Sequence, residues 1–182
     1  TEAEVAMAEM YMRGEVVPLS AKKAIPWYEK GYAKGDVDAM NGLARLYRYG
    51  SGVRKNQEKA FEYYQMASLK DHTRSQVGLA MAYRDARGVK KNLIYAYAWF
   101  SIASSKIDDD EYRQYRKTYE DEQENLNRNQ PQCEYILEGK TFGHIFAVGY
   151  GKQMLKDLKK RLSVKQIRKA EALASELKLT IK

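Results

Sequence analysis

Few residues in this 182-residue sequence have side chains suited to covalent or metal chemistry. The chain contains one cysteine, Cys133, and two histidines, His72 and His144. Nucleophilic catalysis needs a hydroxyl or thiol beside a base, and a structural zinc site needs about four nitrogen or sulfur ligands. Neither histidine has a partner that sequence spacing identifies, and a lone thiol forms no internal disulfide. We therefore predict no catalytic residue, no metal site and no cofactor.

Two further motifs resemble ligand sites but lack essential parts. The string Gly-Tyr-Gly-Lys at 149–152 lacks the spacing of a phosphate-binding loop and follows no predicted strand. The acidic run at 108–111 lacks the alternating ligands, the central glycine and the final glutamate of a calcium loop. We interpret the first motif as structural. We interpret the second as the start of a helix, where carboxylates face the positive end of the helix dipole.

The net charge of +8 is unevenly distributed along the chain. Residues 1–106 carry 17 basic and 11 acidic groups, residues 107–130 carry 4 and 8, and residues 131–182 carry 11 and 5. Basic residues cluster near the C-terminus at Lys156, Lys159, Lys160, Arg161, Lys165, Arg168 and Lys169. Such a cluster suits phosphate contacts, but no base-reading motif accompanies it, and the acidic middle segment would repel an extended polyanion. We interpret the cluster as a solvated helix face and do not expect nucleic-acid binding.

A 36-residue period organises the first 105 residues. Equivalent residues recur without gaps at Ala3, Ala39 and Ser75, at Tyr11, Tyr47 and Tyr83, and at Ala24, Ala60 and Ala96. In each period, apolar residues four apart predict a first helix, as in Ala39, Leu43 and Tyr47. A second stripe with spacing i, i+3, i+4, i+7 begins at Ala60 and predicts a second amphipathic helix.

Polar and glycine residues at the same period predict where these helices begin and end. Glycines at 14, 50 and 88 suit left-handed C-terminal caps of the first helices. Side-chain oxygens of Ser20, Asn56 and Asn92 suit N-caps of the second helices. Because one helix pair cannot cover its own apolar surface, neighbouring pairs must stack, which predicts an α-solenoid.

Residues Ala39 to Ala67 resemble the Sel1-like repeat family, a relative of the tetratricopeptide repeat. The family pattern is A-x-x-x-L-x-x-x-Y-x-x-G-x-G-V, followed by x-x-[DN]-x-x-x-A-x-x-W/Y-Y/F-x-x-A, and the resemblance covers residues 3 to about 105. It implies an all-α, right-handed α-solenoid of three helix-turn-helix repeats at 1–38, 39–74 and 75–105. Val16 and Ala86 replace glycines of the pattern, Pro26 lies inside a predicted helix, and the paired cysteines of secreted members are absent.

The remainder of the chain, beyond the repeats, divides into two parts. Residues 106–151 are expected to form an acidic helix followed by an irregular insert, and for 131–151 an irregular loop and the start of another helix both fit. Residues 152–182 predict two basic C-terminal capping helices, the second beginning with a Ser163-x-x-Gln166 capping box.

The face of each first helix opposite its packing stripe is the predicted binding surface, since the resemblance implies that this helix lines the inner curve. Its columns across the repeats are Val5-Asn41-Val77, Glu9-Arg45-Met81 and Met12-Arg48-Arg84, flanked by Arg13, Tyr49 and Asp85. Arginine, methionine and tyrosine are enriched at protein interfaces. We therefore predict partner contacts from Glu9, Met12, Arg13, Asn41, Arg45, Arg48, Tyr49, Met81, Arg84 and Asp85.

The resulting hypothesis is a non-enzymatic adaptor that binds an acidic or mixed-charge polypeptide in its concave groove. The alternative is an immunity-type inhibitor of a secreted bacterial toxin or lipase effector, with the insert at 108–150 as its plug. No apolar run suits a membrane span. The chain starts at Thr1, so processing of a longer chain is expected, and we favour the bacterial periplasm or secretion over the cytoplasm. The oligomeric state stays open.

Overall fold

A computed structural model describes residues 2–14, 16–106 and 140–181, apart from the side chains of 140–145. Within these ranges every regular element is an α-helix: α1 Glu2–Arg13, α2 Ala21–Ala33, α3 Val37–Tyr49, α4 Gln57–Leu69, α5 Thr73–Asp85, α6 Leu93–Ser104, α8 Lys140–Lys159 and α9 Val164–Thr180. The all-α prediction is confirmed. The predicted acidic helix at 108–130, the proposed plug as far as residue 139, and Cys133 lie outside the described residues, as does the His144 side chain.

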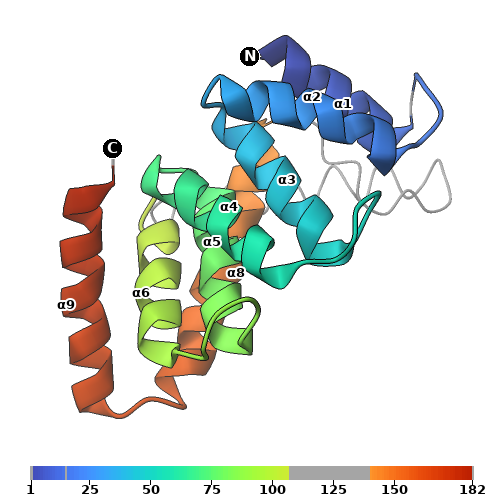
Figure 1. Ribbon diagram of the computed structural model, residues 1–182. Coiled ribbons are helices and arrows are strands. Elements are labelled where there is room, and N and C mark those ends of the chain that lie inside the picture. The colour runs from blue at the N-terminus through green and yellow to red at the C-terminus, as the bar shows by residue number, and fades with distance from the viewer. Residues whose placement is uncertain (1, 15, 107–139, 182) are drawn as a thin grey trace, which may run out of the picture.

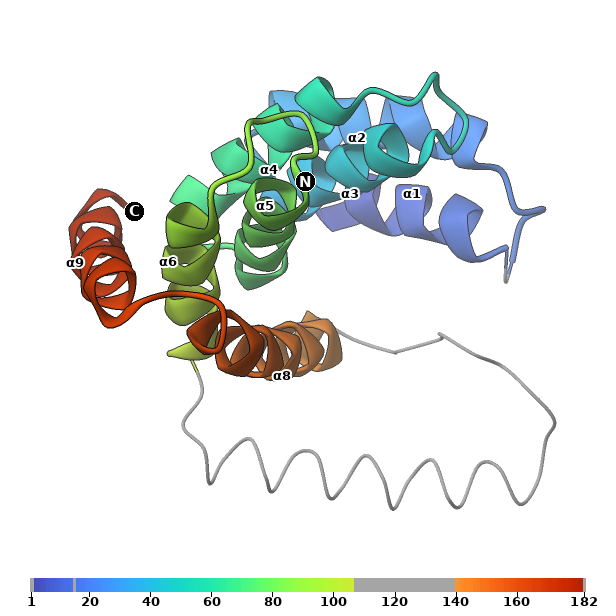
Figure 2. The same ribbon diagram turned by 90° about the horizontal axis from the view of Figure 1, so that it is seen from below.

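The helices form an arch of three pairs, α1 with α2, α3 with α4 and α5 with α6. The first helix of each pair lies on the inner side and the second on the outer side (Figures 1 and 2). The predicted N-caps are confirmed, because Ser20, Asn56 and Asn92 accept hydrogen bonds from backbone N–H groups of α2, α4 and α6. Side-chain caps at the same place in each repeat fix where every outer helix starts.

One of the predicted glycine C-caps, Gly88, is wrong. Gly50 ends α3 in the left-handed conformation as expected, but α5 ends at Ala86, with φ of 59°, rather than at Gly88. Gly88 also has positive φ, and a Cβ there would lie 2.1 Å from the carbonyl oxygen of Gln57. Glycine is therefore required at 88 by the close approach of α4, not by the helix end.

Tyrosine-on-glycine contacts set the spacing between repeats. The ring of Tyr28, on α2, lies against Gly42 of α3, and the ring of Tyr64, on α4, lies against Gly78 of α5. A Cβ at these glycines would approach the rings to 2.4 Å and 2.6 Å. Both tyrosines are buried, so each ring fills the space that the missing side chain leaves.

The first repeat departs from the predicted packing stripe. Ala3 is exposed, whereas its equivalents Ala39 and Ser75 are buried, because no described helix packs on the other side of α1. Pro26 lies beyond the first turn of α2, yet the helix continues to Ala33. The loss of one backbone donor is thus tolerated on an exposed face.

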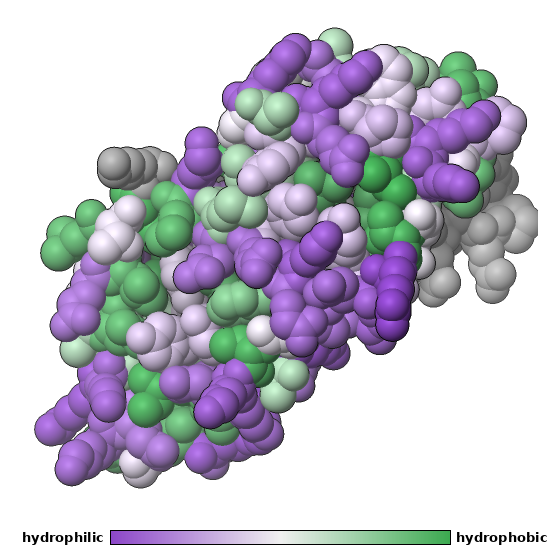
Figure 3. Space-filling model, viewed as in Figure 1, coloured by the Kyte–Doolittle hydropathy of each residue, from purple (hydrophilic) through white to green (hydrophobic). Residues whose placement is uncertain are grey.

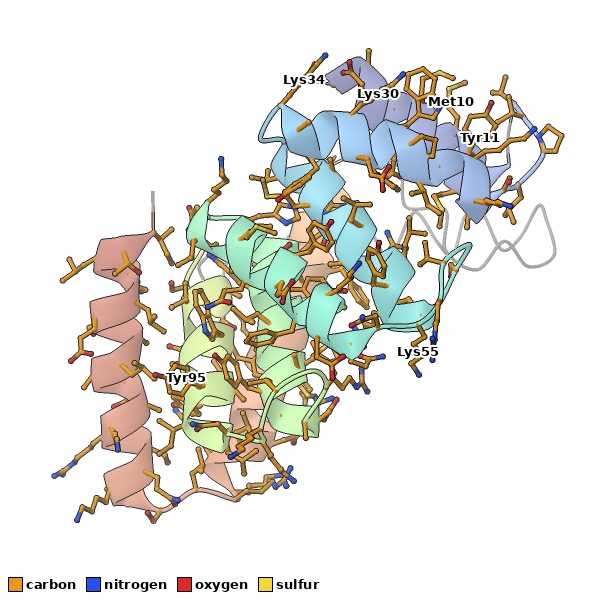
Figure 4. The ribbon with its side chains drawn as sticks, in the orientation of Figure 1. Met10, Tyr11, Lys30, Lys34, Lys55 and Tyr95 are labelled. Carbon is orange, nitrogen blue, oxygen red and sulfur yellow. The ribbon has the colours of Figure 1, made fainter. Side chains whose placement is uncertain are left out.

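Lysines one period apart, each in the turn that follows an outer helix, contact polar groups nearer the N-terminus. Lys34 pairs with Glu4, Lys70 donates to the carbonyl oxygen of Gly35 at 3.5 Å, and Lys106 pairs with Asp71. Lys34 lies at the edge of the arch opposite Lys55 (Figure 4). The edge formed by the turns between repeats is therefore held by polar contacts within the molecule.

The C-terminal helices enclose α6 from two sides (Figure 2). Helix α8 packs against α6 and α5, and α9 packs against a different side of α6. Because α6 is apolar around its whole circumference, as in LIYAYAWFSIAS, both sides need cover. The capping box predicted at Ser163 and Gln166 is present at the start of α9.

Residues 140–151, for which an irregular loop and a helix start were both open, are helical, so α8 begins twelve residues before the predicted capping segment. Gly151 is buried, and a Cβ there would lie 2.6 Å from the Ser104 hydroxyl oxygen. The glycine allows α8 to approach α6 closely.

Candidate binding surface on the inner face

The inner face is formed by α1, α3 and α5, with α8 lying along the end of this face nearest α5 (Figure 2). The ten residues predicted to contact a partner all belong to these three helices. Their surroundings differ from repeat to repeat, because only the third repeat has α8 against it.

Asn41 was predicted to contact a partner, but the residue is only 6% exposed. The Ser75 hydroxyl on α5 donates a hydrogen bond to its Oδ1 at 3.2 Å. Val5 and Val77, in the same column, are also buried. This column lies near the start of each inner helix, where neighbouring helices converge, so Asn41 joins two repeats instead of facing a partner.

In the first repeat, Glu9 is held within the chain. It accepts hydrogen bonds from the Arg13 guanidinium at 3.2 Å and from the Tyr28 hydroxyl at 3.4 Å. Burial, and next the negative charge of Glu9, raise the pKa of Tyr28. Met12 is half-buried and Arg13 is exposed at the edge of the surface. Met12 and Arg13 are thus the reachable residues of this repeat.

In the second repeat, two arginines on the inner face form no ion pair among the described residues, although the charge of Arg48 helps to lower the pKa of Asp85. Arg45 is exposed and forms no ion pair there. The Arg48 guanidinium lies 5.0 Å from the centre of the Tyr49 ring, and its Nη1 is 3.9 Å from the Met81 sulfur. Tyr49 is 63% exposed. This repeat presents positive charge beside an exposed aromatic ring.

In the third repeat, the predicted contact residue Arg84 binds the chain's own α8. Arg84 donates two hydrogen bonds to Asp85, at 2.6 Å and 2.8 Å. Its Nη1 also donates to the Tyr150 hydroxyl at 3.1 Å and lies 2.8 Å from the Met154 sulfur. The Arg84 hydrogen bonds lower the pKa of Asp85. Arg84 and Asp85 are therefore occupied, and the open surface is confined to the first two repeats and Met81.

Sequence reasoning missed Tyr150 and Met154, which the structure brings to the inner face. Their spacing of four residues, on the same turn of a helix as the buried Gly151 and half-buried Leu155, is a helical signal. Three glycines between 143 and 151 concealed that signal because glycine usually marks loops.

Asp38, His72 and Ser75 lie together and resemble a catalytic triad in composition, although His72 Nε2 accepts a hydrogen bond from Arg74. His72 Nε2 is 3.3 Å from Asp38, and its Nδ1 is 2.8 Å from the Ser75 hydroxyl. Ser75 is fully buried, however, so a substrate cannot reach its oxygen. The three side chains join the second and third repeats.

The described residues also show little that would hold a small ligand on this face. No cluster of three or more potential metal-binding side chains occurs among them. The cavity beside Arg48, Gln57 and Tyr64 has a volume of about 10 Å³, whereas metabolite pockets occupy about 300 Å³ or more. A larger hollow of about 760 Å³ lies at the loop between α3 and α4 and is lined mainly by polar and charged residues of 53–59. The inner face suits a surface contact rather than an enclosed ligand.

Comparison with known proteins matches the arch to one family. The sequence profile of the Sel1 repeat matches residues 1–36, 37–72 and 73–108. Among solved structures, c5321, a protective antigen of uropathogenic Escherichia coli with an SLR fold, is 20% identical and aligns with 99% of this chain at a TM-score of 0.71. A Sel1 repeat protein from Oxalobacter formigenes is 26% identical over 61% of this chain, with a TM-score of 0.56.

The chain spans 30% of the length of the first of these proteins and 46% of the second. No curated protein matches this chain. The similarity therefore identifies the repeat and its fold.

Proposed function

Because this chain belongs to the Sel1 repeat family, whose repeats generally mediate protein interactions, we propose that it is a non-enzymatic adaptor. Its partner is an acidic or mixed-charge polypeptide segment that lies along the inner face of α1 and α3. The contacts come from Met12, Arg45, Arg48 and Tyr49, with Met81 at the border with α8.

The observation that supports this proposal is the pair of inner-face arginines that form no ion pair with the residues described by the structure. Elsewhere on this face the charges are matched, since Arg13 pairs with Glu9 and Arg84 pairs with Asp85. The exposed Arg45 and the half-buried Arg48 instead place positive charge beside the exposed Tyr49 ring. A carboxylate from a partner would form charge-assisted hydrogen bonds there, and the ring offers contact area at a small entropic cost.

A photo-cross-linking experiment tests this proposal. The photoreactive amino acid p-benzoylphenylalanine replaces Tyr49 on the inner face, or Gln65, an exposed residue of the outer helix α4, as the matched control. We expect a protein cross-linked from position 49 and absent from position 65. Purified, that protein should bind the Arg45→Glu variant on the order of tenfold more weakly.

Arg45 is the residue to reverse because it is exposed and forms no ion pair within 2–14, 16–106 and 140–181, whereas Arg84 holds α8 and its loss would disturb the fold. Identical cross-linked proteins from positions 49 and 65 would contradict binding at the inner face. Unchanged affinity of the Arg45→Glu variant would contradict the role of positive charge.

A further inference from the structure

The end of the molecule that carries the α8–α9 turn is strongly basic and is separate from the inner face of α1 and α3. In Figure 1 the loop between α5 and α6 lies toward the same lower end of the molecule as this turn. Hydrophilic residues predominate there in the space-filling view (Figure 3). We call this the basic end and define it by six exposed cations: Lys90, Lys91, Lys159, Lys160, Arg161 and Lys165.

These six cations are not neutralised by neighbouring carboxylates in the described part of the chain. None of them forms an ion pair there. Asp85 lies at this end, but its oxygens already bind Arg84 and Arg87. Asp157 is half-buried on α8. Unpaired like charges at one end generate a positive potential that attracts an anionic surface.

An exposed aliphatic side chain lies among these cations. Val164, the first residue of α9, is 68% exposed and directly precedes Lys165. Burying a valine from water is favourable only where the opposing surface offers apolar contact. The sugar-phosphate backbone of a nucleic acid offers little, whereas the boundary between lipid headgroups and acyl chains offers much.

From this combination we propose that the basic end binds the surface of membranes containing anionic phospholipids. The six cations lie over lipid phosphates, and Val164 inserts between headgroups. The contact is peripheral, because none of the described helices is long and apolar enough to cross a bilayer. It leaves the inner face of α1 and α3 open, so this proposal stands apart from the proposed adaptor function.

Co-sedimentation with vesicles tests the proposal on the whole chain. We expect binding to vesicles of phosphatidylcholine mixed with phosphatidylglycerol, reversed by salt, and none to phosphatidylcholine alone. Replacing Lys160, Arg161 and Lys165 with glutamine should weaken binding on the order of 100-fold, because each basic residue near an anionic membrane contributes a factor of about five. A control variant carries glutamine at Lys30, Lys70 and Lys178, which are exposed and lie away from the basic end. It loses the same charge, but its affinity for the anionic vesicles should change less than about twofold.

The Val164→Ser variant separates a lipid surface from a nucleic acid. It should bind the anionic vesicles several-fold more weakly and should bind duplex DNA unchanged. Equal weakening by the two triple-glutamine variants would show that net charge alone drives binding and would overturn the proposal. Tighter binding to duplex DNA than to vesicles, with no effect of Val164→Ser on either, would assign the basic end to nucleic acid instead. Circular dichroism confirms that each variant is folded.

Discussion

Replacing Gly42 with alanine should destabilise the protein, although alanine is the better helix former. In the interior of a helix such as α3, alanine gains about 1 kcal/mol over glycine. The new Cβ would lie 2.4 Å, 2.5 Å and 2.7 Å from three atoms of the Tyr28 ring. Tyr28 is 2% exposed and its hydroxyl binds Glu9, so the ring has no free position. Overpacking costs about 1–3 kcal/mol, and three close ring atoms place this case at the upper limit. Because the gain in helix propensity offsets about 1 kcal/mol of that cost, the net loss of stability should be about 2 kcal/mol.

A double-mutant cycle measured by urea unfolding, followed by circular dichroism, separates the clash from helix propensity. In a Tyr28→Ala background the ring is gone, so Gly42→Ala should instead stabilise by about 1 kcal/mol, which gives a coupling energy of about 3 kcal/mol. The midpoint and the slope of the urea unfolding transition should both be compared among the variants, because repeat arrays can unfold in parts.

Position 6 provides a matched control, because it lies one period before Gly42, carries alanine and is exposed. No ring contact governs it, so Ala6→Gly should cost about 1 kcal/mol through propensity alone. The same loss for Gly42→Ala in both backgrounds, or a gain in the native background, would refute the tyrosine-on-glycine explanation of repeat spacing.

Two further predictions concern the C-terminal helices, and a third concerns the end of α5. Ser163→Ala removes one half of the capping box with Gln166 and should lower the free energy of unfolding by about 1 kcal/mol in urea titrations, whereas an unchanged midpoint would show the box to be dispensable. Arg84→Met should release the Tyr150 hydroxyl and accelerate amide hydrogen exchange in α8 but not in α3, and uniform acceleration would contradict a local role. Because the folded pKa of Asp85 is lowered, its stabilising effect is present above its ordinary value of 3.8 and is lost as the pH falls through the folded pKa. Asp85→Asn should therefore flatten the acid limb of the stability profile, and an unchanged acid limb would assign the effect elsewhere.

The repeats could be predicted from sequence because their signals are local. The caps at Ser20, Asn56 and Asn92 and the apolar stripes depend on residues within one helix or turn. Both helices of every repeat therefore follow from the period. Ala86 shows the limit of this reasoning, since a non-glycine residue adopts the left-handed cap while Gly88 is needed for an approach between repeats.

The candidate site was harder to predict because its residues are defined by distant contacts. Arg84 binds Tyr150, which lies 66 residues further along the chain and beyond an insertion that breaks the period. Asn41 is on the predicted face of α3, but its burial depends on Ser75 of the next repeat. Face assignment from one helix cannot show what a neighbouring element covers.

The enclosure of α6 between α8 and α9 has a consequence for how the protein is made. Helix α6 ends at Ser104, but the helices that cover it are complete only at Thr180. At the usual rate of translation, its aromatic and aliphatic side chains stay uncovered on the ribosome for roughly 4–15 s after they are synthesised. The first two repeats can pack during that interval, so the nascent chain is most vulnerable to aggregation at its third repeat.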